Sequence, residues 1–119
     1  MNKYTELSDF EINKAVFHKA KIKHKYFRFL PNGVITYNIK GKYQVFDPCN
    51  NPFDAMPIII ENNISLRAPT ITDRWKAEFI DEYGNYVGYR RALNKNPLRA
   101  AMELFLLMKD AENENNNNS

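Results

Sequence analysis

Two Asn-Pro pairs constrain the fold of this chain most, because each of them predicts the start of a helix. They are Asn51-Pro52 and Asn96-Pro97. The Asn side-chain oxygen can accept a hydrogen bond from an amide of the first turn, and proline suits the first helical position, where its missing N–H costs nothing. Pro57 lies further inside the first helix, so we expect either a restart or a kink between residues 51 and 60. Asn62-Asn63 should end this helix, since Asn tolerates the left-handed conformation.

The N-terminal part of the chain predicts a helix followed by a hairpin. Ser8 and Glu11 have the spacing of a capping box, in which each side chain bonds to the backbone amide of the other residue. The apolar residues that follow recur with helical spacing, so we expect an amphipathic helix from Asp9 to about Ala20. Asn32-Gly33 is a strong hairpin signal between two runs rich in aromatic and β-branched residues. The strands predicted here are residues 25–30, 34–39 and 43–46.

After the first Asn-Pro helix, the sequence predicts three more strands and a last helix. The strands expected are residues 64–68, 74–80 and 86–92. The pattern indicates a single α+β domain over residues 1–110, in which an N-terminal helix and hairpin strands precede a helix, a three-stranded antiparallel meander and a second helix. The helices should pack on one sheet. The Asn-rich residues 111–119 should form a disordered polar tail.

The last helix is apolar on more than one side. We expect burial for Ala101, Met102 and Phe105, and partial exposure for Glu103 and Leu107. If only one side of this helix is covered, Leu104 and Leu107 leave an apolar patch, and such patches mark interaction sites. Leu104 and Leu107 are therefore a candidate protein interface.

Basic residues are concentrated in the N-terminal third. Residues 1–42 carry nine Lys or Arg and three Asp or Glu, although the net charge of the whole chain is only +3. Lysines alternate with other residues through the segment His18–Arg28, where they could grip phosphates while aromatic neighbours stack on bases. A solvated helix end and an edge strand protected by lysine would explain the same pattern. The candidate nucleic-acid contacts are Lys19, Lys21, Lys23, Lys25 and Arg28.

No catalytic constellation stands out in the sequence. Cys49 precedes a helix start, which can lower a thiol pKa, but no basic residue adjoins it, and a turn explains Asp47–Asn51 better. No ligand cluster has the spacing of a zinc site, so we expect no metal, no cofactor and no enzymatic activity. A single cysteine excludes an internal disulfide and fits a reducing cytosol. No apolar run approaches the length of a membrane span.

Several segments of the chain resemble the NinX family of lambdoid phages and prophages. They are Leu7–Val16, Phe46–Pro52, Asp54-Ala55, Pro57–Ile59, Glu61-Asn62, Ile64–Leu66 and Asn96–Met102. Phe53 and Met56 depart from the family pattern, in which a small residue and a Trp are usual. The resemblance implies a phage accessory protein made in the cytoplasm of a bacterial host, encoded among genes many of which act on recombination, DNA or host factors. It implies no established activity and assigns no functional residue.

Two functional hypotheses remain open at this point. The first is a non-enzymatic accessory protein that binds and modulates a host or phage protein, for example a defence or recombination component. The second is a nucleic-acid-binding module that uses the basic segment His18–Arg28. They differ in their salt dependence, because counterion release makes nucleic-acid binding weaken steeply as salt is added.

Overall fold

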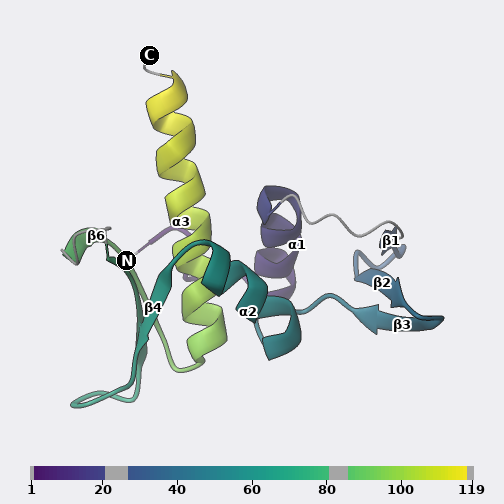
Figure 1. The fold of residues 1–119 in the computed structure, drawn as a ribbon, viewed down its shortest axis with the longest axis horizontal. Helices are drawn as coiled ribbons and strands as arrows, with labels where there is room; N and C mark the ends of the chain where they lie inside the picture. The colour runs from purple at the N-terminus through teal and green to yellow at the C-terminus, as the bar shows by residue number, and fades with distance from the viewer. Residues whose placement is uncertain (1, 21–26, 81–85, 118–119) are drawn as a thin grey trace.

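The computed structural model describes residues 2–20, 27–80 and 86–117, and its layers are arranged around one helix (Figure 1). This helix, α3, spans Pro97–Asn117. A three-stranded sheet packs on one side of α3, and α1 (Asp9–Ala20) and α2 (Pro52–Glu61) pack on the other. A second three-stranded sheet lies beyond α1 and α2, on the far side of the molecule from the first.

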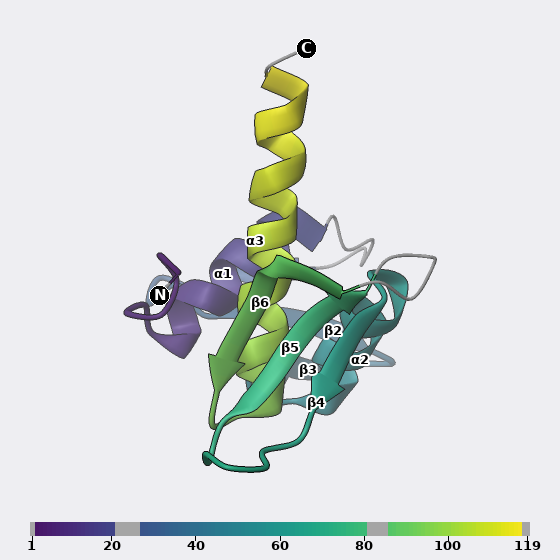
Figure 2. The same cartoon turned by 90° about the vertical axis from the view of Figure 1, so that its left-hand side faces the viewer.

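The strands of the described residues form two antiparallel sheets. The N-terminal sheet has the order β1-β2-β3, with β1 at Phe27–Phe29, β2 at Ile35–Ile39 and β3 at Lys42–Val45. The C-terminal sheet has the order β4-β5-β6, with β4 at Ile64–Arg67, β5 at Trp75–Ile80 and β6 at Tyr86–Asn94, and it covers α3 in Figure 2. The predicted α+β class and order of elements are confirmed, but the expectation of one sheet is wrong. α2 follows β3 in the chain and packs against α3. The strands after α2 therefore form a separate sheet that packs on α3.

Each helix begins at the residue that the sequence predicts. The Ser8 hydroxyl accepts a hydrogen bond from the Glu11 amide at 3.1 Å, and the Glu11 carboxylate accepts one from the Ser8 amide at 3.2 Å. Asn51 and Asn96 cap α2 and α3, because each side-chain oxygen accepts the amide two residues later, at 3.0 and 2.9 Å. Asn63 follows α2 with a φ of 55°, so the predicted left-handed end is confirmed.

Of the two alternatives predicted at Pro57, a restart or a kink, the restart is wrong, because α2 is one continuous helix of ten residues with Pro57 inside it. Pro57 lacks the N–H that would bond to the carbonyl of Phe53. Both residues are exposed, so water can hydrate this carbonyl and the helix continues. Pro57 therefore marks the solvent-facing side of α2 rather than its end.

The core of the molecule is built mainly on α3. All residues from Ala100 to Leu106 are buried, and all of them except Glu103 belong to the same apolar cluster as Ile12 and Val16 of α1 and Ile58 of α2. On the other side of α3, Ala77 and Ala92 are opposite each other in β5 and β6. Their small side chains allow the C-terminal sheet to approach α3 closely.

Aromatic side chains attach the N-terminal sheet to the helices. The Phe17 ring of α1 packs edge-to-face against Phe27 and Phe46, with ring centroids 4.4 and 5.9 Å apart. The Tyr37 hydroxyl of β2 donates a hydrogen bond of 2.5 Å to the Asp54 carboxylate of α2. Burial, followed by this hydrogen bond, raises the pKa of Tyr37, so the hydroxyl keeps its proton and the contact is stable at neutral pH.

The C-terminal residues continue α3 instead of forming the expected tail. The helix extends to Asn117, so the expectation of disorder from Ala111 is wrong for residues 111–117. Ala and Glu are good helix formers, and Lys109 and Glu112 form an ion pair of 3.3 Å within one helical turn, which supports the helix. Among the described residues, no helix is both long and apolar enough to cross a membrane.

Substitution of Phe105 tests directly which side of α3 faces the core. Its side chain is 1% exposed, so Phe105→Ala should lower the free energy of unfolding by about 3–5 kcal/mol. Leu107 on the same helix is only half-buried, and Leu107→Ala should cost clearly less. Equilibrium unfolding in urea measures both losses. Equal losses, or a neutral Phe105→Ala, would mean that a different side of α3 faces the core.

Candidate functional site

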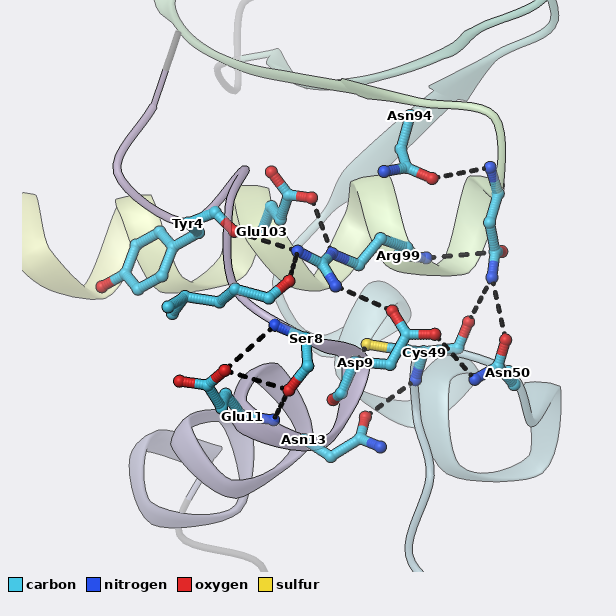
Figure 3. Close-up of polar contacts among 12 residues, drawn as sticks. Tyr4, Ser8, Asp9, Glu11, Asn13, Cys49, Asn50, Asn94, Arg99 and Glu103 are labelled. Carbon is cyan, nitrogen blue, oxygen red and sulfur yellow. Dashed lines mark hydrogen bonds and ion pairs between the residues drawn. The ribbon is translucent and has the colours of Figure 1, made fainter.

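A polar junction centred on Arg99 joins the N-terminal segment, α1 and α3 (Figure 3). The guanidinium donates from Nε to Glu103 and from Nη1 to Asp9, each at 2.7 Å. Nη2 donates to the backbone carbonyls of Tyr4 at 2.9 Å and Leu7 at 2.7 Å. The Arg99 side chain is 7% exposed and that of Glu103 is 1% exposed, so this ion pair lies almost entirely out of water. We call these five residues the Arg99 junction.

The contacts of Arg99 leave its guanidinium little capacity to bind a ligand. Four of its five N–H donors are engaged within the protein. Burial lowers the pKa of Arg99, but its hydrogen bonds to Glu103 and Asp9 outweigh burial and raise the pKa overall. The side chain is therefore charged at every physiological pH, and the Arg99 junction is a structural contact that fixes α1 against α3.

Asn side chains extend the Arg99 junction to the loop before α2 (Figure 3). The Asn96 amide group donates to the carbonyl of Cys49 at 2.6 Å, and the Asn13 side chain accepts the Cys49 amide at 3.1 Å. The Asn50 amide group donates to the second carboxylate oxygen of Asp9 at 3.2 Å. These contacts bring α1, α3 and the start of α2 together, so the position of α2 depends on them.

Cys49 carries the only thiol among the described residues of this region, and its surroundings suppress the reactivity of that thiol. The side chain is fully buried, and its Sγ lies 3.8 Å from the carbonyl oxygen of Asp9. Burial raises the pKa of the Cys49 thiol, and the Asp9 carboxylate raises it further, although Arg99 opposes this. Because only the thiolate is a strong nucleophile, Cys49 is unreactive at neutral pH. The described residues contain no group of three His, Cys, Asp or Glu side chains that could hold a metal ion.

α2 exposes a row of large apolar side chains. Phe53 is 64% exposed, Met56 41% and Ile60 67%. Their spacing of three and four residues places them on one face of the helix, and Pro57 between them is also exposed. The opposite face of α2 is buried in the core. We call Phe53, Met56, Pro57 and Ile60 the α2 stripe.

A cleft of about 410 Å³ opens at the Phe53 end of the α2 stripe. It lies between the start of α2 and the hairpin of β2 and β3, and it is lined by Ile39, Lys40, Lys42, Gln44, Asn51 and Phe53. None of these lining residues is acidic, whereas Glu61 at the other end of α2 is exposed. The α2 stripe therefore runs from a positively charged end to a negatively charged end.

The structure places only some of the predicted nucleic-acid contacts. Lys19 is exposed near the end of α1, and Arg28 is exposed on β1. The other three, Lys21, Lys23 and Lys25, lie outside the described residues. A continuous basic surface over His18–Arg28 therefore stays a prediction.

The candidate interface on α3 requires a correction. Leu104 is fully buried, because α3 is covered by the C-terminal sheet on one side and by α1 and α2 on the other. Leu107 is half-buried, as expected. Glu103 was expected to be partly exposed but is buried, because Arg99 one turn earlier neutralises it. The expected burial of Ala101, Met102 and Phe105 is confirmed.

Sequence reasoning missed both the α2 stripe and the buried ion pair. The signal for the α2 stripe was an apolar helix that the chain is too small to cover on all sides, since Phe53 and Met56 accompany three successive Ile residues. The signal for the ion pair was the spacing of four residues between Arg99 and Glu103 on an otherwise apolar helix. Two charges on such a helix can be buried only if they pair with each other.

A family model described as Bacteriophage P22, NinX matches residues 3–109, which include the Arg99 junction, the α2 stripe and the cleft. The chain belongs to the NinX family. The resemblance noted in the sequence is thereby confirmed, and membership of NinX indicates a small phage accessory protein. No curated protein and no solved structure matches the chain significantly.

The Arg99 junction makes a prediction about the stability of this NinX chain. Arg99→Ala leaves Glu103 buried without its partner, so the free energy of unfolding should fall by about 3–5 kcal/mol. Replacing both residues by apolar ones, Arg99→Met with Glu103→Leu, should cost less than the single change. Lys95→Ala is the matched control, because Lys95 pairs with Asp73 on the surface and should contribute about 1 kcal/mol or less. If Arg99→Ala and Lys95→Ala are equally mild in urea unfolding, the Arg99 junction does not hold α1 to α3.

Cys49 makes a prediction about chemical reactivity. Because its pKa is raised, the thiol stays protonated at pH 8, and burial also blocks access. The native protein should therefore react with iodoacetamide at least about tenfold more slowly than the same protein unfolded in urea. Mass spectrometry of the alkylated cysteine measures the two rates. Equal rates in the native and unfolded protein would contradict the buried position of Cys49.

Proposed function

We propose that this phage accessory protein acts without catalysing a reaction, by binding and modulating a host or phage protein through the α2 stripe. The observation that carries the proposal is the exposure of Phe53, Met56 and Ile60 on one face of α2. Exposed apolar patches rimmed by polar residues mark protein interaction sites. Here the rim includes Lys40 and Lys42 at one end and Glu61 at the other.

The α2 stripe offers suitable anchors for a protein partner. A large apolar side chain contributes about 1.5–3 kcal/mol when it is fully removed from water, and Phe and Met are enriched in protein interfaces. The start of α2 is held by the Asn51 cap and by the contact of Asn50 with Asp9. The backbone of α2 is therefore ordered before a partner binds. Because little conformational entropy is lost on binding, this favours affinity.

The shape and charge of the α2 stripe indicate which shape and charge the binding surface of the partner should have. An exposed helix forms a convex ridge, so the partner should supply an apolar groove. Lys40 and Lys42 favour acidic residues of the partner near the Phe53 end, and Glu61 favours basic residues near the Ile60 end. Such complementary charges fix the orientation of the partner and speed association more than they raise affinity.

The surroundings of Cys49 support the non-enzymatic part of the proposal. A nucleophilic cysteine needs access to substrate and a lowered pKa. Burial blocks the access and raises the pKa of Cys49. The Asp9 and Arg99 side chains near it are engaged in contacts within the protein.

A capture experiment with two matched variants tests the proposal. Ile60 belongs to the α2 stripe, whereas Ile71, in the loop before β5, is 96% exposed and lies outside it. Both variants, Ile60→Lys and Ile71→Lys, place a charge at an exposed position, so both should keep the melting temperature of the wild type. Immobilised protein is incubated with nuclease-treated extract of infected host cells. We expect Ile60→Lys to lose a host or phage protein that the wild type and Ile71→Lys both retain.

Two results would contradict the proposed function. In the first, Ile60→Lys and Ile71→Lys capture the same proteins in the same amounts as the wild type. In the second, sedimentation shows that the wild type self-associates and that Ile60→Lys alone is monomeric, which would make the α2 stripe a contact between copies of this chain.

A further inference from the structure

The N-terminal sheet has a second face, opposite the one that joins the core. Its residues alternate between the faces, so buried Ile35 and Tyr37 point one way and exposed Arg28 and Tyr43 point the other. The register of the three strands sets out the second face, which we call the outer face: Arg28, Thr36, Asn38, Tyr43 and Val45. It differs from the α2 stripe because most of its residues are polar or amphipathic.

Arg28 and Tyr43 lie in contact on the outer face, and we call this pair the platform. They come from β1 and β3, the two edge strands, and meet across β2 with the guanidinium carbon 5.6 Å from the ring centroid. Tyr43 is 58% exposed, so much of the ring remains accessible. The guanidinium lies over the ring in a cation–π contact, and unpaired bases stack on exposed aromatic and guanidinium surfaces.

The segment that forms α1 and the N-terminal sheet is rich in positive charge. From Ile12 to Phe46 the sequence contains eight Lys or Arg and no Asp or Glu. Within the part of the chain that the structure describes, Arg28 has no carboxylate partner, and Lys14, Lys19, Lys40 and Lys42 are also exposed. A phosphate backbone that approaches Arg28 is therefore attracted, whereas the carboxylates of Asp9 and Asp47 line a pocket at the Val45 end of the sheet.

The C-terminal sheet carries a buried carboxylate among its cations. On the face of the C-terminal sheet opposite to that of Ala77, Arg67 and Lys76 approach the carboxylate of Glu78 at 3.3 and 4.0 Å. Glu78 is 3% exposed, so the cations that flank it offset a buried negative charge. The outer face of the N-terminal sheet, in contrast, has no acidic residue among its five residues.

We propose that the outer face of the N-terminal sheet binds single-stranded nucleic acid, with a base stacked on Tyr43 and a phosphate on Arg28. This is a second activity, separate from the protein binding through the α2 stripe. A single strand fits better than a duplex, because the platform offers stacking surface that only unpaired bases can use. Thr36 and Asn38 between the two edge strands supply hydrogen-bonding groups for base edges or phosphate.

Fluorescence anisotropy with labelled oligothymidylate of about 20 nucleotides tests the proposal. The wild-type chain should bind at about 50 mM salt and lose affinity steeply by about 200 mM. Tyr43→Thr keeps a good strand residue but removes the ring, and should weaken binding roughly tenfold. Tyr43→Phe keeps the ring and should bind within about threefold of the wild type.

Two further variants distinguish binding at the outer face from general attraction of the oligonucleotide to positive charge. Arg28→Gln should weaken binding and reduce its salt dependence, because one phosphate contact is lost. Arg74→Gln removes an exposed cation just before β5 of the C-terminal sheet and should leave binding unchanged. Circular dichroism should show the same fold and melting temperature for all four variants.

Any of three results would overturn the proposal. The first is no binding of the wild type at the lowest salt. The second is equal binding by Tyr43→Thr and the wild type, or equal binding of a duplex and the single strand, which would leave only unspecific charge attraction. The third is competition by polyglutamate as effective as that by unlabelled oligothymidylate, which would indicate an acidic protein as the ligand instead.

Discussion

The buried guanidinium of Arg99 is the contact on which the rest of the structure depends. α3 is apolar on nearly all sides, and a charge inside such a helix destabilises the protein unless it is paired and hydrogen-bonded. Arg99 meets this condition with Glu103 on its own helix, with Asp9 on α1 and with two backbone carbonyls of the N-terminal segment. Because Asp9 in turn contacts Asn50, the same junction fixes the start of α2 and hence the direction in which the α2 stripe faces.

Much of the fold could be predicted from local signals in the sequence. The caps Ser8, Asn51 and Asn96 were found because capping depends on residues within a few positions of one another. The division into two sheets was missed, because it depends on α2 packing against α3 far from it in the chain. The extension of α3 beyond Ala111 was missed for a related reason, since composition suggested disorder where helix propensity and an ion pair continue the helix.

The candidate sites were less predictable, because apolar residues in a helix do not reveal which side is covered. Leu104 and Phe53 both look suitable for an interface or for a core, and only the packing of neighbouring elements decides between them. The structure buries Leu104 between two layers and leaves Phe53 at the surface. The basic residues of the N-terminal third were evident from composition. The pairing of Arg28 with Tyr43 depends on strand register, which residues alone do not specify.

The central claim is that the α2 stripe contacts another protein during infection. Site-specific photo-crosslinking tests it most directly, with a photoreactive amino acid placed at position 56 in the α2 stripe or at position 71 in the exposed loop. Illumination of infected cells should join the position 56 protein to one defined host or phage protein, identified by mass spectrometry, and the position 71 protein should give no such product. The absence of a product from position 56, or the same products from both positions, would contradict the claim.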